Sequence, residues 1–193
     1  TSKLLGIALI FQGVFAMLSG AVFFSQLEVK GDIEATMINI AGEIWRINAD
    51  IIGQLLTALG IAFLGVMLYI ALKKTRKSLA LTALTFSVIE AAILAYSRVE
   101  SFALLRISQE YLAQGQPEYL LTMGKMALEK VQYAYTIHML PFCLGAVLFY
   151  SLLIKSKIMP RAIAIWGVIS VVGFLIGTIL SIFGQEAPIA WYA

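Results

Sequence analysis

The chain has 193 residues, of which 61% are hydrophobic and only 13% charged, and its formal net charge is +3. A soluble domain is about 45–50% apolar and about 25% charged, so this composition excludes a soluble globular enzyme and a disordered polar chain. The single cysteine, Cys143, excludes a disulfide scaffold. The sequence therefore predicts an all-α integral membrane protein.

Five apolar segments follow one another along the chain, each long enough to cross about 30 Å of hydrocarbon at about 1.5 Å per residue. We expect these spans at Leu4 to Phe24, Ile47 to Leu72, Ser78 to Leu105, Val131 to Ile154 and Ile163 to Phe183. The first segment is rich in glycine and lacks a small-residue cleavage site, which argues against a signal peptide. The whole chain, residues 1–193, is expected to form one transmembrane helical bundle.

Lysine and arginine residues in the short loops set the orientation of such a bundle. One side carries only basic residues, namely Lys3, Lys73, Lys74, Arg76, Lys77, Lys155, Lys157 and Arg161. The other side carries both acidic and basic residues. We therefore expect the amino terminus inside and the carboxyl terminus outside the cytoplasmic membrane. Because the basic residues cluster at helix ends, as topology requires, membrane lipids are the expected partners and nucleic acid is not.

Two segments on the outer side have features of helices. Apolar residues recur at helical spacing from Ile33 to Ile44, which predicts a short amphipathic helix on the outer membrane surface. Pro117 followed by Glu118 is typical of a helix start that can continue into the fourth span. Both segments are also explained by a simple cap that shields the helix ends.

Polar residues inside the spans are the candidates for a site, because a charge at bilayer depth costs at least about 2.5–3.5 kcal/mol. Glu90 lies closest to the bilayer centre, and Arg98 lies two turns outward on the same helical face. About 12 Å of helical rise separates them, so they cannot pair. Asp50 and Gln54 lie at a matching outer depth of the second span. We therefore predict an ion pair between Asp50 and Arg98.

The fourth span carries Tyr135 and the only histidine, His138, followed by Pro141. Proline removes its own amide and leaves the carbonyl of Ile137 without its helical donor. The polar residues of the second, third and fourth spans lie at similar depths in the membrane. They predict a polar pocket that opens to the extracytoplasmic side and holds a small amphiphile, with Glu90 as its floor. The predicted ligand-binding residues are Asp50, Gln54, Glu90, Arg98, Tyr135 and His138. Each also has a plain structural explanation as a helix-packing hydrogen bond or salt bridge.

Several other chemistries lack the residues or motifs that they need. One histidine and one cysteine cannot form a bis-histidine haem, a thiolate zinc site or a CxxC redox centre. No phosphate-binding glycine loop and no HExxH motif is present. No spacing supports a triad of Ser97, His138 and Asp50, or a carboxylate-bound metal. We expect neither a cofactor nor a metal, and the catalytic residues, if any exist, are not identifiable.

Two runs of the sequence match a known pattern. The run Leu59 to Val99 has a span ending in Leu-Tyr, a basic turn and a phenylalanine-to-glutamate step from Phe86 to Glu90. The run Leu140 to Ser170 has a basic turn with Pro-Arg followed by Trp-Gly. Together they resemble the bacterial multipass membrane proteins of the domain of unknown function 4386 family.

The resemblance implies a helical bundle in the cytoplasmic membrane and no established activity. Relatives often carry arginine just after the phenylalanine, where this chain has Ser87. Glu90 therefore needs another partner here.

Three classes of function stay open. In the first class, the chain is a binding protein for a small amphiphile or lipid. It would act as a transporter or sensor in which Glu90 and His138 respond to protons. Alternatively, it is a membrane enzyme for a lipid or isoprenoid, with Glu90 or Asp50 as acid or base and Arg98 holding an anionic headgroup. Lastly, it is an accessory subunit whose polar residues only fix helix packing.

Overall fold

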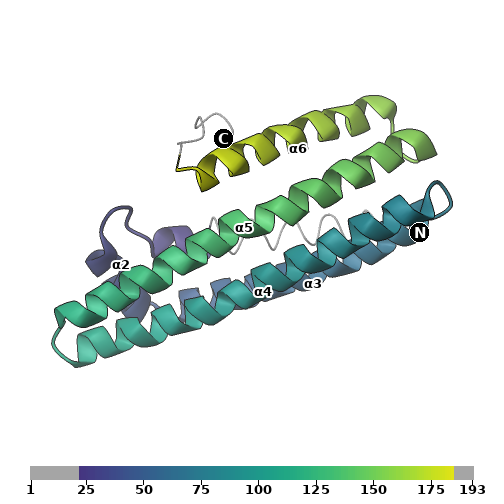
Figure 1. The fold of residues 1–193 in the computed structure, drawn as a ribbon. Coiled ribbons are helices and arrows are strands. Elements are labelled where there is room, and N and C mark those ends of the chain that lie inside the picture. Colours follow the sequence, from purple (N-terminus) through teal and green to yellow (C-terminus); the bar gives the residue numbers. More distant parts are fainter. Residues whose placement is uncertain (1–21, 185–193) are drawn as a thin grey trace. The chain divides into compact units, whose positions relative to one another are not determined.

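The computed structural model describes residues 22–184, and the expected first span lies almost entirely outside them. In chain order the described elements are the 3-10 helix η2 (Phe24–Gln26) and the α-helices α2 (Ile33–Gly42), α3 (Ile44–Leu72), α4 (Lys77–Ala113), α5 (Glu118–Ser156) and α6 (Arg161–Ile182) (Figure 1). The described part of the chain contains no strand. The all-helical prediction is confirmed.

Four of these helices, α3 to α6, are long and apolar enough to cross a membrane. They contain the second to fifth predicted spans, so the chain is a multipass membrane protein. Helices α4 and α5 are longer than the third and fourth predicted spans that they contain. Helices α4 and α5 have 37 and 39 residues, which is about 55–60 Å at 1.5 Å per residue. Both helices therefore extend well beyond about 30 Å of hydrocarbon.

The turn between α4 and α5 explains where this extension stops. The amide of Gln116 donates to the carbonyl of Tyr111, and the amide of Gly115 donates to that of Leu112. With Gly115 at φ +77°, this is a Schellman motif, which ends a helix and satisfies its last carbonyls. Pro117 then precedes α5, as the sequence predicts.

The chain divides into two compact units, and α3, α4 and α5 run from one into the other. We call residues 60–92 and 136–184 the Glu90 unit, and residues 22–59 and 93–135 the Arg98 unit.

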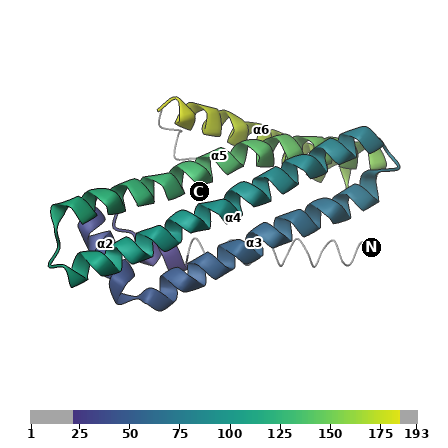
Figure 2. The same ribbon diagram turned by 60° about the horizontal axis from the view of Figure 1, so that its bottom comes forward.

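In the Arg98 unit, the predicted amphipathic helix is confirmed as α2. Asp32 caps it, because its carboxylate accepts a hydrogen bond of 2.9 Å from the amide of Ala35. The prediction of a helix lying on the membrane surface implied that its apolar stripe faces lipid. The stripe packs against protein instead. Met37 is fully buried against Tyr111 of α4 and Leu120 of α5, beyond the predicted spans. The extended ends of α4 and α5 provide this protein surface (Figure 2).

The long helices bury one stripe each. On α4 and α3 the buried residues recur in alternating steps of three and four, which is the heptad spacing of left-handed helix packing. On α4 the positions with this spacing are Ala80, Ala83, Ser87, Glu90, Leu94, Ser97, Ser101, Leu104 and Ser108, and on α3 they are Ile47, Ile51, Gln54, Ala58, Ile61 and Gly65. Buried beside them are Ala91, Arg98, Leu105 and Tyr111 of α4 and Asp50, Gly53, Thr57 and Leu72 of α3. Polar residues, Gln54 and Glu90 among them, thus occupy packing positions, and Asp50 and Arg98 are buried beside these positions.

In the Glu90 unit, two glycines bring helix backbones close to α4. A Cβ added at Gly65 of α3 would lie 2.9 Å from Cβ of Ser87, and one at Gly145 of α5 would lie 3.1 Å from Cβ of Phe86. Both contacts meet α4 at the same level, one turn from Glu90. The close packing of membrane helices through small residues is expected.

Candidate ligand-binding site

The depth of the predicted site follows from helix geometry. Arg98 lies 21 residues after Lys77, where α4 begins, and Asp50 lies 22 residues before Leu72, where α3 ends. At about 1.5 Å per residue both lie about 32 Å from the basic turn that joins the two helices. A hydrocarbon core about 30 Å thick that starts at this turn therefore ends near Asp50 and Arg98.

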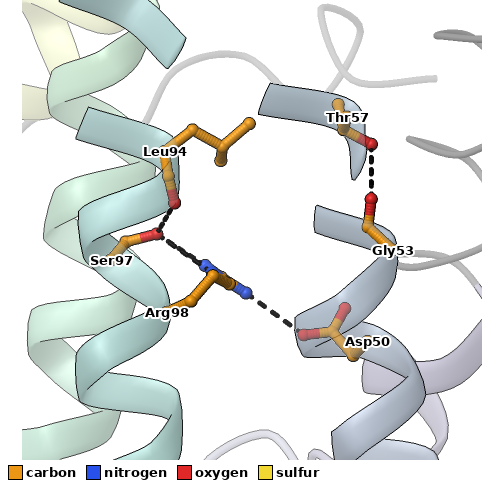
Figure 3. Close-up of polar contacts among 6 residues, drawn as sticks. All are labelled: Asp50, Gly53, Thr57, Leu94, Ser97 and Arg98. Carbon is orange, nitrogen blue, oxygen red and sulfur yellow. Dashed lines mark hydrogen bonds and ion pairs between the residues drawn. The ribbon is translucent and has the colours of Figure 1, made fainter. Parts of the chain in front are cut away.

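Arg98 is held by contacts on both helices (Figure 3). Its Nη1 donates to Oδ2 of Asp50 at 3.1 Å, and its Nε and Nη2 donate to Oγ of Ser97 at 3.1 and 2.9 Å. The Ser97 hydroxyl in turn donates to the carbonyl of Leu94. Arg98 and Asp50 are only 5% and 1% exposed. The predicted ion pair between these residues is confirmed.

This layer contains buried polar atoms that the described residues do not satisfy. Oδ1 of Asp50 and Oγ of Ser101, one turn beyond Ser97, have no well-formed hydrogen bond from residues 22–184. Gln54 lies close enough to Asp50 to stabilise its carboxylate, but not in good geometry for Oδ1. Arg98 uses three of its five N–H groups within the same described range. We call Asp50, Gln54, Ser97, Arg98 and Ser101 the Arg98 layer.

Tyr135 is the remaining predicted site residue of the Arg98 unit. Its side chain is 53% exposed, so it lies on the surface of α5 and not among the buried residues of the Arg98 layer.

The other two predicted site residues, Glu90 and His138, belong to the Glu90 unit, and both are buried. The fully buried thiol of Cys143 is close enough to Glu90 for an electrostatic interaction. Within the part of the chain that the structure describes, no residue gives the Glu90 carboxyl a hydrogen bond or an opposite charge. The expectation that Glu90 forms the floor of the predicted pocket stays a prediction.

A comparison with known proteins shows to which family the chain belongs. A family model described as a domain of unknown function (DUF4386) matches residues 4–192. The chain belongs to this family. No curated protein and no solved structure matches the chain. The family carries no assigned activity, so function has to be argued from the geometry.

The motifs that carry the resemblance of this DUF4386 protein all lie in the Glu90 unit. Phe86 faces Gly145, and Pro160 immediately precedes α6. A Cβ at Gly167 would lie 2.5 Å from the ring of Tyr150, so glycine leaves room for this ring between α6 and α5. These motif residues therefore have packing roles, while the Arg98 layer lies outside the motifs.

Two features of the DUF4386 chain were missed in the sequence. Ser101 was not singled out, although Ser97 and Ser101 lie one turn apart on the face of Arg98. Tyr111 donates to Glu34 of α2 at 3.1 Å, a contact without any short-range sequence signal. No group of three or more histidine, cysteine, aspartate or glutamate residues in the described range is arranged to hold a metal.

Proposed function

We propose that this protein binds a small amphiphile or lipid and holds its polar head at the Arg98 layer, on the extracytoplasmic side of the cytoplasmic membrane. One observation carries the proposal. Arg98 is a buried arginine with N–H groups to spare, and two buried oxygens, Oδ1 of its partner Asp50 and Oγ of Ser101 one helical turn along α4, have no hydrogen bond from residues 22–184.

The chemistry of this layer defines the ligand class. A buried polar group left unpaired costs about 1–3 kcal/mol, so a ligand that satisfies these atoms gains that free energy. Arg98 needs an acceptor, whereas Asp50 needs a donor. A head that combines a phosphate or carboxylate with a hydroxyl or ammonium group meets both needs. A hydrocarbon tail suits the depth, because the layer lies where the hydrocarbon ends.

The alternatives are supported less well. Catalysis by Asp50 would require a carboxylate that is already paired with Arg98. Transport or sensing would add Glu90 and His138 to the proposed binding function, with proton uptake as the coupled event.

The binding proposal is tested by native mass spectrometry of protein purified in mild detergent. Removing one partner of a buried pair damages folding, whereas apolar replacement of both is often tolerated. The test variant is therefore Asp50→Leu combined with Arg98→Met. The matched control is Glu100→Ala with Lys130→Ala, which removes an ion pair of 3.5 Å on the surface of the same unit.

We expect wild type and the control to carry a defined adduct of lipid or amphiphile mass that the test variant lacks. If folded wild type carries no adduct, or if the test variant keeps it, the Arg98 layer only fixes helix packing and the accessory-subunit function leads.

The orientation is tested separately. Cys143 is the only cysteine, so Cys143→Ala gives a background into which single cysteines can be placed. We expect a cysteine at Lys74 to resist an impermeant thiol reagent added to intact cells, and one at Gln114 to be labelled. The reverse pattern would place the Arg98 layer on the cytoplasmic side.

A further inference from the structure

We propose that the two basic turns of the Glu90 unit form one docking surface for anionic phospholipid headgroups. This surface, the basic rim, consists of Lys73, Lys74, Arg76, Lys77, Lys155, Lys157 and Arg161. It is independent of the Arg98 layer, which belongs to the other unit.

The packing of the Glu90 unit brings the two turns to the same end. Leu72 and Ala80, on either side of the first turn, share one hydrophobic cluster with Leu152, Leu153 and Ala164, on either side of the second. All seven basic side chains are exposed. The rim is thus a single surface, held by a buried core directly beneath it.

The rim carries only one sign of charge. The first turns of α4 and α6 contain no acidic residue, and the one acidic residue among the described residues of this unit, Glu90, is buried within α4. In the Arg98 unit, by contrast, acidic residues outnumber basic ones. Uncompensated basic residues at a membrane surface attract anionic lipid, and each contributes substantially to that attraction.

The surroundings of the rim favour a lipid over a soluble polyanion. Immediately beside the basic residues, large apolar side chains are exposed, including Ile158 at 52%, Ile163 at 56% and Trp166 at 69%. Charged side chains at a helix end with apolar side chains along the next turns match a headgroup phosphate and the first carbons of its acyl chains. The occupant is therefore a lipid of the surrounding bilayer.

The test uses the purified full chain in nanodiscs of equal parts phosphatidylglycerol and phosphatidylcholine with identical acyl chains. Lipids that stay bound after release into the gas phase are counted by native mass spectrometry. The test variant neutralises four rim residues, Lys73→Gln, Lys74→Gln, Lys77→Gln and Lys157→Gln. The matched control neutralises four exposed cations of the Arg98 unit, Lys30→Gln, Arg106→Gln, Lys125→Gln and Lys130→Gln, so both variants have the same net charge.

We expect wild type and the control to retain phosphatidylglycerol selectively, and the test variant to lose this selectivity by roughly tenfold or more. In wild type the selectivity should also fall several-fold between 0.05 and 0.5 M salt, because exposed charges are screened. The salt series needs no variant and therefore holds even where the fourfold variant misfolds.

Equal retention of both lipids by wild type would overturn the proposal. So would an equal loss in the control, because net charge alone would then explain the binding. The Asp50→Leu, Arg98→Met variant should keep full selectivity, so a failure of the Arg98 layer and a failure of the rim give different results.

Discussion

The two units of this protein place a buried carboxyl group in opposite settings. In the Arg98 unit, Asp50 contacts a cation 3.1 Å away and a second polar residue on its own helix. In the Glu90 unit, the described residues offer Glu90 neither a cation nor a hydrogen bond, and the glycine contacts lie one turn away. The difference shows that two acidic residues in membrane helices of one chain need not have the same role.

This contrast has an energetic basis. An ionised group in the hydrocarbon requires a partner, and Asp50 has one at the edge of that region. Around Glu90, close helix packing stabilises the structure, because Gly65 and Gly145 let the helix backbones approach each other closely. We therefore expect charge substitutions to destabilise the Arg98 unit most. Substitutions that add side-chain volume should destabilise the Glu90 unit most.

The largest effect is expected from Asp50→Ala. It leaves the Arg98 guanidinium buried without its counter-ion, which should lower the free energy of unfolding by about 3–5 kcal/mol. Labelling of the buried thiol of Cys143 during denaturation measures this. Lys130→Ala, which removes a surface ion pair, should change it by less than about 1 kcal/mol. Similar values for both variants would show that the ion pair does not stabilise the folded protein.

The next effect is expected from Gly65→Val in the Glu90 unit. The added Cβ would meet Cβ of Ser87, an atom next to the α4 backbone that cannot move aside. Overpacking of this kind costs about 1–3 kcal/mol. Gly42→Ala is the control, since nothing lies within 4 Å of its added Cβ. A Gly65→Val protein as stable as wild type would show that close backbone contact does not define this unit.

A smaller effect is expected from Asp32→Ala, which removes the cap of α2 in the Arg98 unit. Loss of such a cap costs about 1 kcal/mol. Because α2 is short and covers the ends of α4 and α5, hydrogen exchange of its amides should rise more than that of the neighbouring helices. Uniform changes over the Arg98 unit would mean instead that α2 unfolds only together with the bundle.

The smallest effect on stability is expected from Glu90→Gln. Among residues 22–184, Glu90 has no ion pair or hydrogen bond to lose, so the free energy of unfolding should change by less than about 1 kcal/mol, the value of one net hydrogen bond. Asp50→Asn is the matched change at the paired carboxyl and should cost more. Equal losses would reveal a partner for Glu90 beyond residues 22–184. If Glu90 takes part in proton-coupled transport, its variant should fold normally but lose flux.

The sequence was sufficient to predict those features that follow from regular spacing along a helix. Apolar run lengths predicted the spans within α3 to α6, and matching depths predicted the pair of Asp50 with Arg98. Depth counting measures position along the membrane normal, so it does not tell which of these residues share a compact unit. The surface position of Tyr135 depends on the rotation of α5, which its neighbours determine.

Other features depend on contacts between distant segments. The close contacts that Gly65 and Gly145 make, each opposite one short stretch of α4, join segments that lie far apart in the sequence. The start of α5 was predicted from Pro117 and Glu118, whereas the extension of α4 beyond its predicted span was not. Met37 and Ile40 of α2 pack against these outer parts of α4 and α5.

The Schellman turn between α4 and α5 has a practical consequence for imaging. Residues 112–116 are all exposed, and the helices on either side run without interruption into the membrane region. Exposed loop tips tolerate insertions well. A rigid helical protein inserted at Gly115, in register with α4 and α5, would give this small chain a fiducial outside the micelle for electron cryo-microscopy, without touching the Arg98 layer or the basic rim.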